Sequence, residues 1–94
     1  MKTANLFFEQ AKRTIEDRGV DYGSPRKSFE GVAKRWSMTL GVKVTPEQVV
    51  MCMIELKLER LSDNPTHADS ILDIAGYAAI LHDIAKENDK GVKR

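Results

Sequence analysis

The sequence predicts an all-α protein, folded as a compact bundle of about four helices. Apolar residues recur at helical spacing along most of the chain. Ser24-Pro25 and Thr45-Pro46 mark two helix starts, because each places proline directly after a capping residue. We see no strand pattern. The 94 residues, of which 41% are hydrophobic, suffice for one domain with a modest core. We expect a single helical domain over residues 1–88 and a flexible polar tail over 89–94.

The first expected helix runs from Thr3 to about Arg18, and Gly19-Val20 should end it. Its apolar stripe consists of Leu6, Phe7, Ala11 and Ile15. The second helix should begin at Pro25, with Ser24 as its cap, and Gly41 should close it. Its apolar stripe consists of Phe29, Val32, Ala33, Trp36 and Leu40, and its basic side of Arg26, Lys27, Lys34 and Arg35.

The third helix has the clearest start, since Thr45 and Gln48 match a capping box and Glu47 complements the helix dipole. It should run to about Leu61. Because apolar residues surround most of its wheel, we expect it to be the central and most buried helix. Asn64-Pro65 breaks it, and Thr66 offers a cap for a fourth helix.

The fourth helix should continue to about Asn88 and is also apolar on most sides. Together, the third and fourth helices carry more apolar surface than a small monomer can bury. We therefore expect a homo-oligomer, a dimer or a larger assembly.

Composition gives no overall sign of several classes of partner. Charged residues make up 31% of the chain but nearly cancel to a net charge of +1, so there is no strong nucleic-acid signal and no sign of an anionic membrane partner. Cys52 is the only cysteine, which fits a reducing compartment. No apolar stretch approaches the ~18 to 20 residues that cross a bilayer. We expect a cytoplasmic protein with no membrane association.

The residues with the most chemistry lie on both sides of the turn between the third and fourth helices. Asp69, Asp73 and Tyr77 follow one another at one-turn spacing and share a face. Antiparallel packing across this short turn should bring Lys57 and Arg60 near the two aspartates. The simplest interpretation is an ion-pair network that joins the helices, with a hydrogen bond from the Tyr77 hydroxyl.

Two ligand sites are also compatible with this arrangement. In one, four carboxylates converge as oxygen ligands of Mg²⁺; they are Glu55, Glu59, Asp69 and Asp73. In the other, Lys57 and Arg60 bind a phosphate directly, and the acids orient them. The two sites differ in which side of the third helix faces the ligand.

A second candidate region is the turn before Pro25. Gly23 permits a positive φ, Ser24 opens a helix whose free N–H groups can receive an anion, and Tyr22 can stack on a ring. The simpler interpretation is a capped turn with solvated charges. His67 and His82 lie about four turns apart, so they do not form a metal pair, and we expect each to be a surface or capping histidine.

The chain from about Asp17 to Ile84 resembles a family of small phage and prophage proteins of unknown function. The residues that carry the resemblance are Asp21-Tyr22-Gly23-Ser24-Pro25, Phe29, Trp36, Thr45-Pro46-Glu47, Lys57, Arg60, Asn64-Pro65, Asp69 and Asp73-Ile74-Ala75-Gly76-Tyr77. That family is distantly similar to the all-α nucleoside triphosphate pyrophosphohydrolases of the MazG type. Those are helical oligomers that use Mg²⁺ and clustered carboxylates to hydrolyse the α–β phosphate bond.

The MazG-type pattern is Glu-x-x-Glu on one helix and Glu-x-x-Asp on the next. Asp73 matches the last acid, but Ser70 stands three residues before it, and the preceding helix carries Glu55-x-x-x-Glu59. Lys57 and Arg60 would oppose a divalent ion at low dielectric and favour a phosphate.

Our first expectation is therefore a phage-type protein that binds a nucleotide or another phosphorylated small molecule, such as a signalling nucleotide of host defence. The alternatives are a Mg²⁺-dependent MazG-like hydrolase and a non-enzymatic protein-interaction module whose charged cluster is structural.

Overall fold

The structure is a computed structural model that describes the backbone of residues 1–22 and 25–88 and the side chains of residues 1–17 and 25–87. These ranges contain four helices and no strand, which confirms the all-α fold. The helices are α1 (Lys2–Tyr22), α2 (Pro25–Leu40), α3 (Pro46–Asp63) and α4 (Ala68–Asn88). None of the described helices is long and apolar enough to cross a membrane.

Most helix ends agree with the sequence prediction, but the end of α1 does not. The helix continues through Gly19-Val20 to Tyr22, so the predicted break is wrong. A single glycine inside a helix costs only about 1 kcal/mol, which a helix of this length tolerates. Asp21 and Tyr22, which the sequence assigned to the turn before Pro25, are therefore helical. Gly23 and Ser24, including the predicted cap, lie outside the described residues.

The connection between α2 and α3 is held by local hydrogen bonds. Gly41 has the positive φ of 72° that suits a residue closing a helix, and its N–H donates to the Ser37 carbonyl at 2.9 Å. The Ser37 hydroxyl accepts from the Val44 N–H at 2.8 Å and donates to the Ala33 carbonyl at 2.7 Å. The path of the chain into α3 is therefore fixed by one serine side chain.

The predicted capping box at the start of α3 is confirmed. The Gln48 N–H donates to the Thr45 hydroxyl at 3.2 Å, and the Thr45 N–H donates to the Gln48 side-chain oxygen at 2.9 Å. Pro46 occupies the first turn, where no N–H partner is needed.

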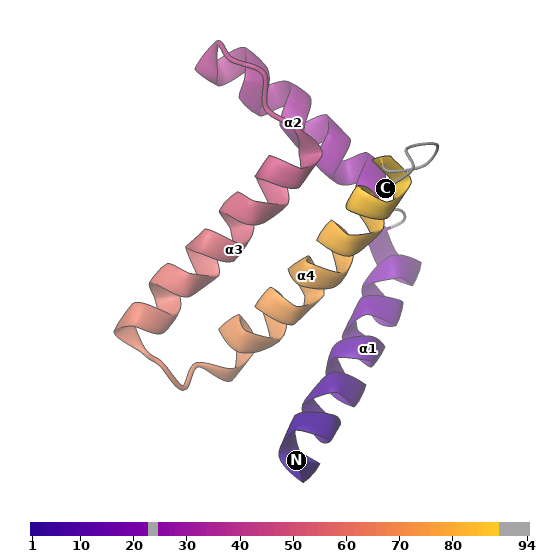
Figure 1. Ribbon diagram of the computed structural model, residues 1–94, viewed down its shortest axis with the longest axis vertical. Coiled ribbons are helices and arrows are strands. Elements are labelled where there is room, and N and C mark those ends of the chain that lie inside the picture. Colours follow the sequence, from indigo (N-terminus) through magenta and orange to yellow (C-terminus); the bar gives the residue numbers. More distant parts are fainter. Residues whose placement is uncertain (23–24, 89–94) are drawn as a thin grey trace.

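Helix α4 lies at the centre of the arrangement. It packs antiparallel to α3 and also contacts α1 and α2 (Figure 1). In Figure 1, α1 runs along the opposite side of α4 from α3, and α2 crosses near the top of the pair. The expectation that α3 would be central is thus wrong, because its neighbours cover only one of its sides.

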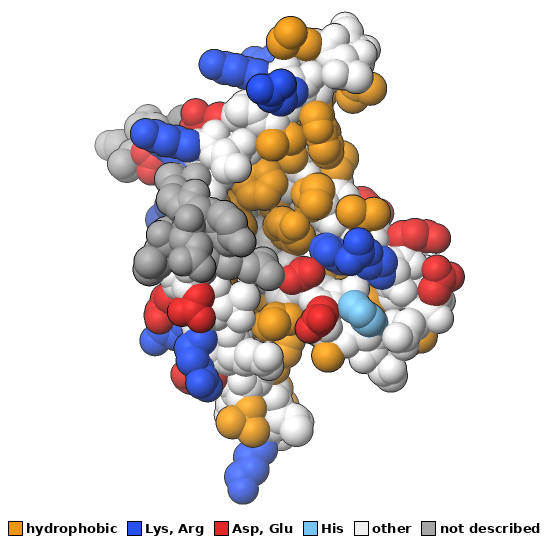
Figure 2. Space-filling view, turned by 180° about the vertical axis from the view of Figure 1, so that it is seen from behind, with side chains coloured by type: hydrophobic (Ala, Val, Ile, Leu, Met, Phe, Trp, Pro, Cys, Tyr) orange, Lys and Arg blue, Asp and Glu red, His pale blue; other side chains and the backbone are white. Residues whose placement is uncertain are grey.

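The buried core is small and consists of small or branched side chains. Its apolar members are Ala11, Ala33, Val49, Val50 and Ile84. On α3, by contrast, Met51, Leu56 and Leu58 are 46%, 46% and 45% exposed. On α2, Leu40 leaves the predicted buried stripe and is exposed. Figure 2 shows apolar side chains gathered over the middle of one face, with charged groups and a histidine beside them.

The capping box provides a test of local stability. Thr45→Ala removes the acceptor of the Gln48 N–H, and we expect it to lower the free energy of unfolding by about 1 kcal/mol. In a domain of this size this corresponds to a Tm lower by about 4 to 8 °C, measured by circular dichroism. Thr39→Ala, at an exposed position on α2, is the matched control and should leave Tm nearly unchanged. Equal Tm values for Thr45→Ala and Thr39→Ala would show that the capping box does not stabilise α3.

Candidate functional site: a mixed-charge cluster between two helices

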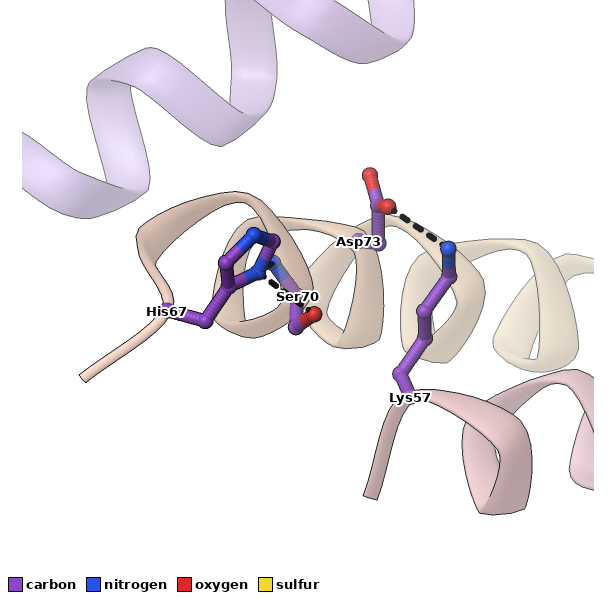
Figure 3. A network of polar contacts seen from close by, with 4 residues as sticks. All are labelled: Lys57, His67, Ser70 and Asp73. Atoms are coloured by element: carbon purple, nitrogen blue, oxygen red, sulfur yellow. Dashed lines mark hydrogen bonds and ion pairs between the residues drawn. The ribbon is translucent and has the colours of Figure 1, made fainter. Parts of the chain in front are cut away.

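The cluster is built around an ion pair between α3 and α4. Lys57 Nζ lies 3.1 Å from Asp73 Oδ2, and the two side chains are only 10% and 19% exposed (Figure 3). Lys57 stands two turns after the fully buried Val50 on the face of α3 that meets α4. The predicted approach of Lys57 to Asp73 across the helical hairpin is therefore confirmed.

Burial makes this pair energetically different from a surface salt bridge. Removing two charges from water is unfavourable by several kcal/mol per ion, and their mutual attraction offsets this only in good geometry. An ammonium at the same position without a carboxylate beside it would lower the free energy of unfolding much more than the pair does. The ammonium of Lys57 therefore depends on Asp73 for its burial.

The N-terminus of α4 is capped by His67. The Ser70 N–H donates to His67 Nδ1 at 3.1 Å, and the Ser70 hydroxyl lies 2.7 Å from the same nitrogen (Figure 3). Because the backbone N–H can only donate, Nδ1 is the unprotonated nitrogen of the neutral ring. His67 thus provides the acceptor that a helix start requires. One of the two predicted roles for this residue, a capping histidine, is confirmed.

The prediction that Thr66 caps α4 is wrong. Its hydroxyl donates instead to the Asn64 side-chain oxygen at 3.2 Å, and α4 begins only at Ala68. The cap is the residue directly before the first helical residue, and that residue is His67. The second histidine, His82, is a surface residue whose ring lies 3.9 Å from the Asp83 carboxylate.

The other members of the predicted cluster are less closely involved. Arg60 and Asp69 are exposed, and no ion pair within the described side chains includes either of them. They lie about one turn from Lys57 and from Asp73, at the end of the hairpin that holds the connecting turn. We use "mixed-charge cluster" for Lys57, Arg60, Asp69 and Asp73.

Tyr77 has a packing role. Its half-buried ring lies edge-on to Phe29, with ring centroids 6.3 Å apart, and so joins α4 to α2. The hydrogen bond predicted for its hydroxyl is absent from the described part of the chain.

The acidic side chains of the predicted metal site are divided between one side of α3 and the start of α4 in the described part of the chain. Glu55 and Glu59 are exposed and lie on the opposite side of α3 from Lys57. Within the described residues, no three His, Cys, Asp or Glu side chains lie close enough together to hold a metal ion. The predicted set of Glu55, Glu59, Asp69 and Asp73 is therefore not gathered at one point. The side chain of Tyr22, with Gly23 and Ser24, lies outside the described residues, and their predicted ligand contacts stay a prediction.

Sequence reasoning missed Ser70. It is 1% exposed and lies beside the capping nitrogen of His67. The available signal was its position three residues after His67, the spacing at which a first-turn N–H meets a cap. Its hydroxyl places a second polar group at the start of α4, one turn before Asp73.

Fold and site together define a small all-α protein in which an ion pair with little exposure joins the central helix α4 to α3. Residues 7–85 match the family described as "Domain of unknown function (DUF6378)". This match includes most of all four helices and the whole cluster, and the chain belongs to this family.

Two curated relatives are phage proteins. The chain is 39% identical over 74 residues to "Gene 55 protein" of Mycobacterium phage L5, covering 78% of this chain and 47% of the relative. It is 34% identical over 87 residues to "Gene 55 protein" of Mycobacterium phage D29, covering 92% of this chain and 58% of the relative. The chain thus spans about half the length of these relatives. No solved structure matches. The resemblance to a phage family of unknown function is confirmed, and the distant similarity to MazG-type enzymes stays a prediction.

The capping role of His67 can be tested by paired substitutions. His67→Ala removes the acceptor of the Ser70 N–H, and we expect the free energy of unfolding to fall by about 1 kcal/mol. His67→Asn should retain most of the stability, because asparagine is a good N-cap. Chemical denaturation measures the free energy of unfolding of both variants. Equal loss in both would show that the ring contributes by packing and not as an acceptor.

The ion pair can be tested by comparing single and double replacement. Lys57→Met leaves the Asp73 carboxylate partly buried without the ammonium, and we expect a loss of about 3 kcal/mol. The double variant Lys57→Met/Asp73→Leu should be considerably more stable than the single one, because no charge is then left in the helix interface. Urea unfolding gives the four free energies of the cycle, those of the wild type, Lys57→Met, Asp73→Leu and the double variant. A double variant as unstable as the sum of both single variants would contradict direct coupling.

Proposed function

We propose that this chain is a phage-type protein that binds a nucleotide or another phosphorylated small ligand at the mixed-charge cluster. The observation that carries the proposal is the Lys57 ammonium, held by Asp73 inside the contact between α3 and α4. A charge held in a helix interface is unfavourable unless it meets a partner, and that partner can be a ligand as well as another side chain.

The small core strengthens this argument. Replacing a buried ion pair by apolar residues of similar volume is often neutral or stabilising. A domain with only five buried apolar side chains among its described residues would benefit from apolar residues here. The presence of Lys57 and Asp73 is therefore more easily explained if the ammonium also has a ligand.

The cluster has the chemistry to hold a phosphate. A lysine ammonium has three donors, and the pair with Asp73 requires only one. The flexible stem of lysine lets the ammonium reach a ligand at the edge of the interface. Arg60, one turn away and exposed, would add a planar fork that binds two phosphate oxygens. Asp69 and Asp73 would orient these cations, while Tyr22, Gly23 and Ser24 are further contacts proposed from sequence.

An interaction module is the second candidate, favoured by the exposed apolar residues. Leu6 and Phe8 on α1, and Met38, Leu40 and Val42 at the end of α2, are all more than 60% exposed, and each group could contact another polypeptide. In that case the ion pair only joins α3 to α4. The Mg²⁺-dependent pyrophosphohydrolase stays a proposal that rests on resemblance, and it requires Glu55 and Glu59 to act together with Asp69 and Asp73.

A thermal-shift panel tests the main proposal with inorganic phosphate, nucleoside mono-, di- and triphosphates and cyclic dinucleotides, each with and without Mg²⁺. A ligand at 100 times its Kd should stabilise the chain by about 2.7 kcal/mol. Arg60→Ala should weaken the shift and leave the melting of the free protein unchanged, because Arg60 is exposed. Lys34→Ala, which removes an exposed cation from α2, should retain the full shift.

The double variant Lys57→Met/Asp73→Leu separates ligand binding from stability, because it should stay folded and lose the ligand shift. No shift with any ligand, or equal shifts in the wild type and Arg60→Ala, would contradict the proposal. Release of pyrophosphate from a triphosphate, abolished by Asp73→Asn, would instead establish the hydrolase.

A further inference from the structure

We propose that a second copy of this chain docks on the face formed by α1 and α4, in a two-fold symmetric arrangement. The two helices border an open groove of about 480 Å³. Its apolar lining consists of Phe8, Ala11 and Ile15 from α1 and Ala75, Ala78 and Ala79 from α4. We call this surface the α1–α4 face. It is separate from the mixed-charge cluster, and the inference does not rest on the proposed ligand.

The α1–α4 face exposes apolar groups that folding of one chain leaves uncovered. The Phe8 ring is 65% exposed, and Ile71, which lies one turn before Ala75 on the same side of α4, is 40% exposed. Helix α4 is apolar on nearly all sides, a pattern typical of a helix covered on all sides. Within the chain, α3 and α1 pack on opposite sides of α4, yet Ile71 and Ala78 stay exposed, so part of α4 lacks the cover that its sequence predicts.

The chain exposes more surface than a compact monomer of its mass, which favours association with a further chain. The chain exposes 7340 Å², whereas a compact monomer of 10.6 kDa exposes about 5,500 Å². Its radius of gyration is 14.8 Å, against about 12 Å for a compact domain of this length. The excess area is of the size that each partner buries in an obligate dimer, about 1,000 to 2,500 Å².

The charges beside the groove favour a second copy over an unrelated partner. Lys12 and Glu16 border the groove one turn apart on α1, both are exposed, and no ion pair within the described side chains joins them. A two-fold axis that sets two α1 helices antiparallel places Lys12 of each copy against Glu16 of the other.

Size-exclusion chromatography with light scattering tests the proposal on the full chain at tens of micromolar. We expect a mass that is a multiple of 10.6 kDa, beginning with the dimer. Ala78→Glu places a charge in the groove and should reduce the assembly to a folded monomer, with helical content checked by circular dichroism. Met38→Glu is the matched control, because Met38 is 83% exposed on α2, outside this face, and should leave the mass unchanged.

A charge swap tests the symmetry without altering the apolar lining. Lys12→Glu alone should raise the dimer dissociation constant by about tenfold, since it sets like charges against one another at two symmetric places. Lys12→Glu/Glu16→Lys should restore the wild-type value. A monomeric wild-type chain, an assembly unaffected by Ala78→Glu, or a swap variant as weak as Lys12→Glu would overturn the proposal. Arg60→Ala should leave the mass unchanged, so failure of the ligand proposal and failure of this one are distinguishable.

Discussion

The contact between α3 and α4 is the interaction on which the rest of the structure depends. The two helices run antiparallel from a short turn, and the Lys57–Asp73 pair lies within their interface. In any other register of this hairpin, a buried ammonium would lack its carboxylate, which is far less favourable than losing a surface contact. The pair therefore disfavours alternative registers. Helix α4, fixed in this way, presents the surface on which α1 packs, while α2 packs across α3 and α4.

The same pair shows why one chain has so little core. The α3–α4 interface buries a lysine and a serine where larger apolar side chains would otherwise add stabilisation. Other packing is contributed by aromatic and ionic contacts near the surface, such as Phe29 against Tyr77 and Arg26 beside Glu87 at 3.8 Å. Such contacts are individually weak. A ligand or a second chain that binds only the folded state would therefore raise the free energy of unfolding of this small-cored chain.

Local signals in the sequence were sufficient for the start of α3, and they failed where neighbouring elements decide the outcome. Thr45 with Gln48 satisfies its own backbone, so the start of α3 could be predicted. Gly19 is a weak stop signal, because a continuous helix on either side outweighs its cost. The exposure of Leu56 and Leu58 on α3 could not be read from periodicity, since it depends on which sides of the helix the neighbours cover.

In the candidate site, too, some contacts could be predicted from the sequence and others could not. Helical spacing and a short turn place Lys57 opposite Asp73, and this pair was predictable. Whether Arg60 and Asp69 join it depends on side-chain directions at the exposed end of the hairpin, which spacing does not determine. Glu55 and Glu59 were grouped with the aspartates by charge, yet the wheel puts them on the opposite side of α3 from Lys57. The wheel therefore favours the phosphate site over the metal site.

Helix α4 is apolar on most sides, and its two opposite sides have different surroundings. Asp73, Tyr77 and Ile84 face the neighbouring helices of the same chain, whereas Ala75 and Ala78 lie roughly half a turn around the helix from Asp73. A second copy on the alanine side would leave the mixed-charge cluster uncovered, so association and ligand binding do not compete for the same surface. This arrangement explains why α4 is apolar almost all round yet carries a carboxylate on the side that meets α3.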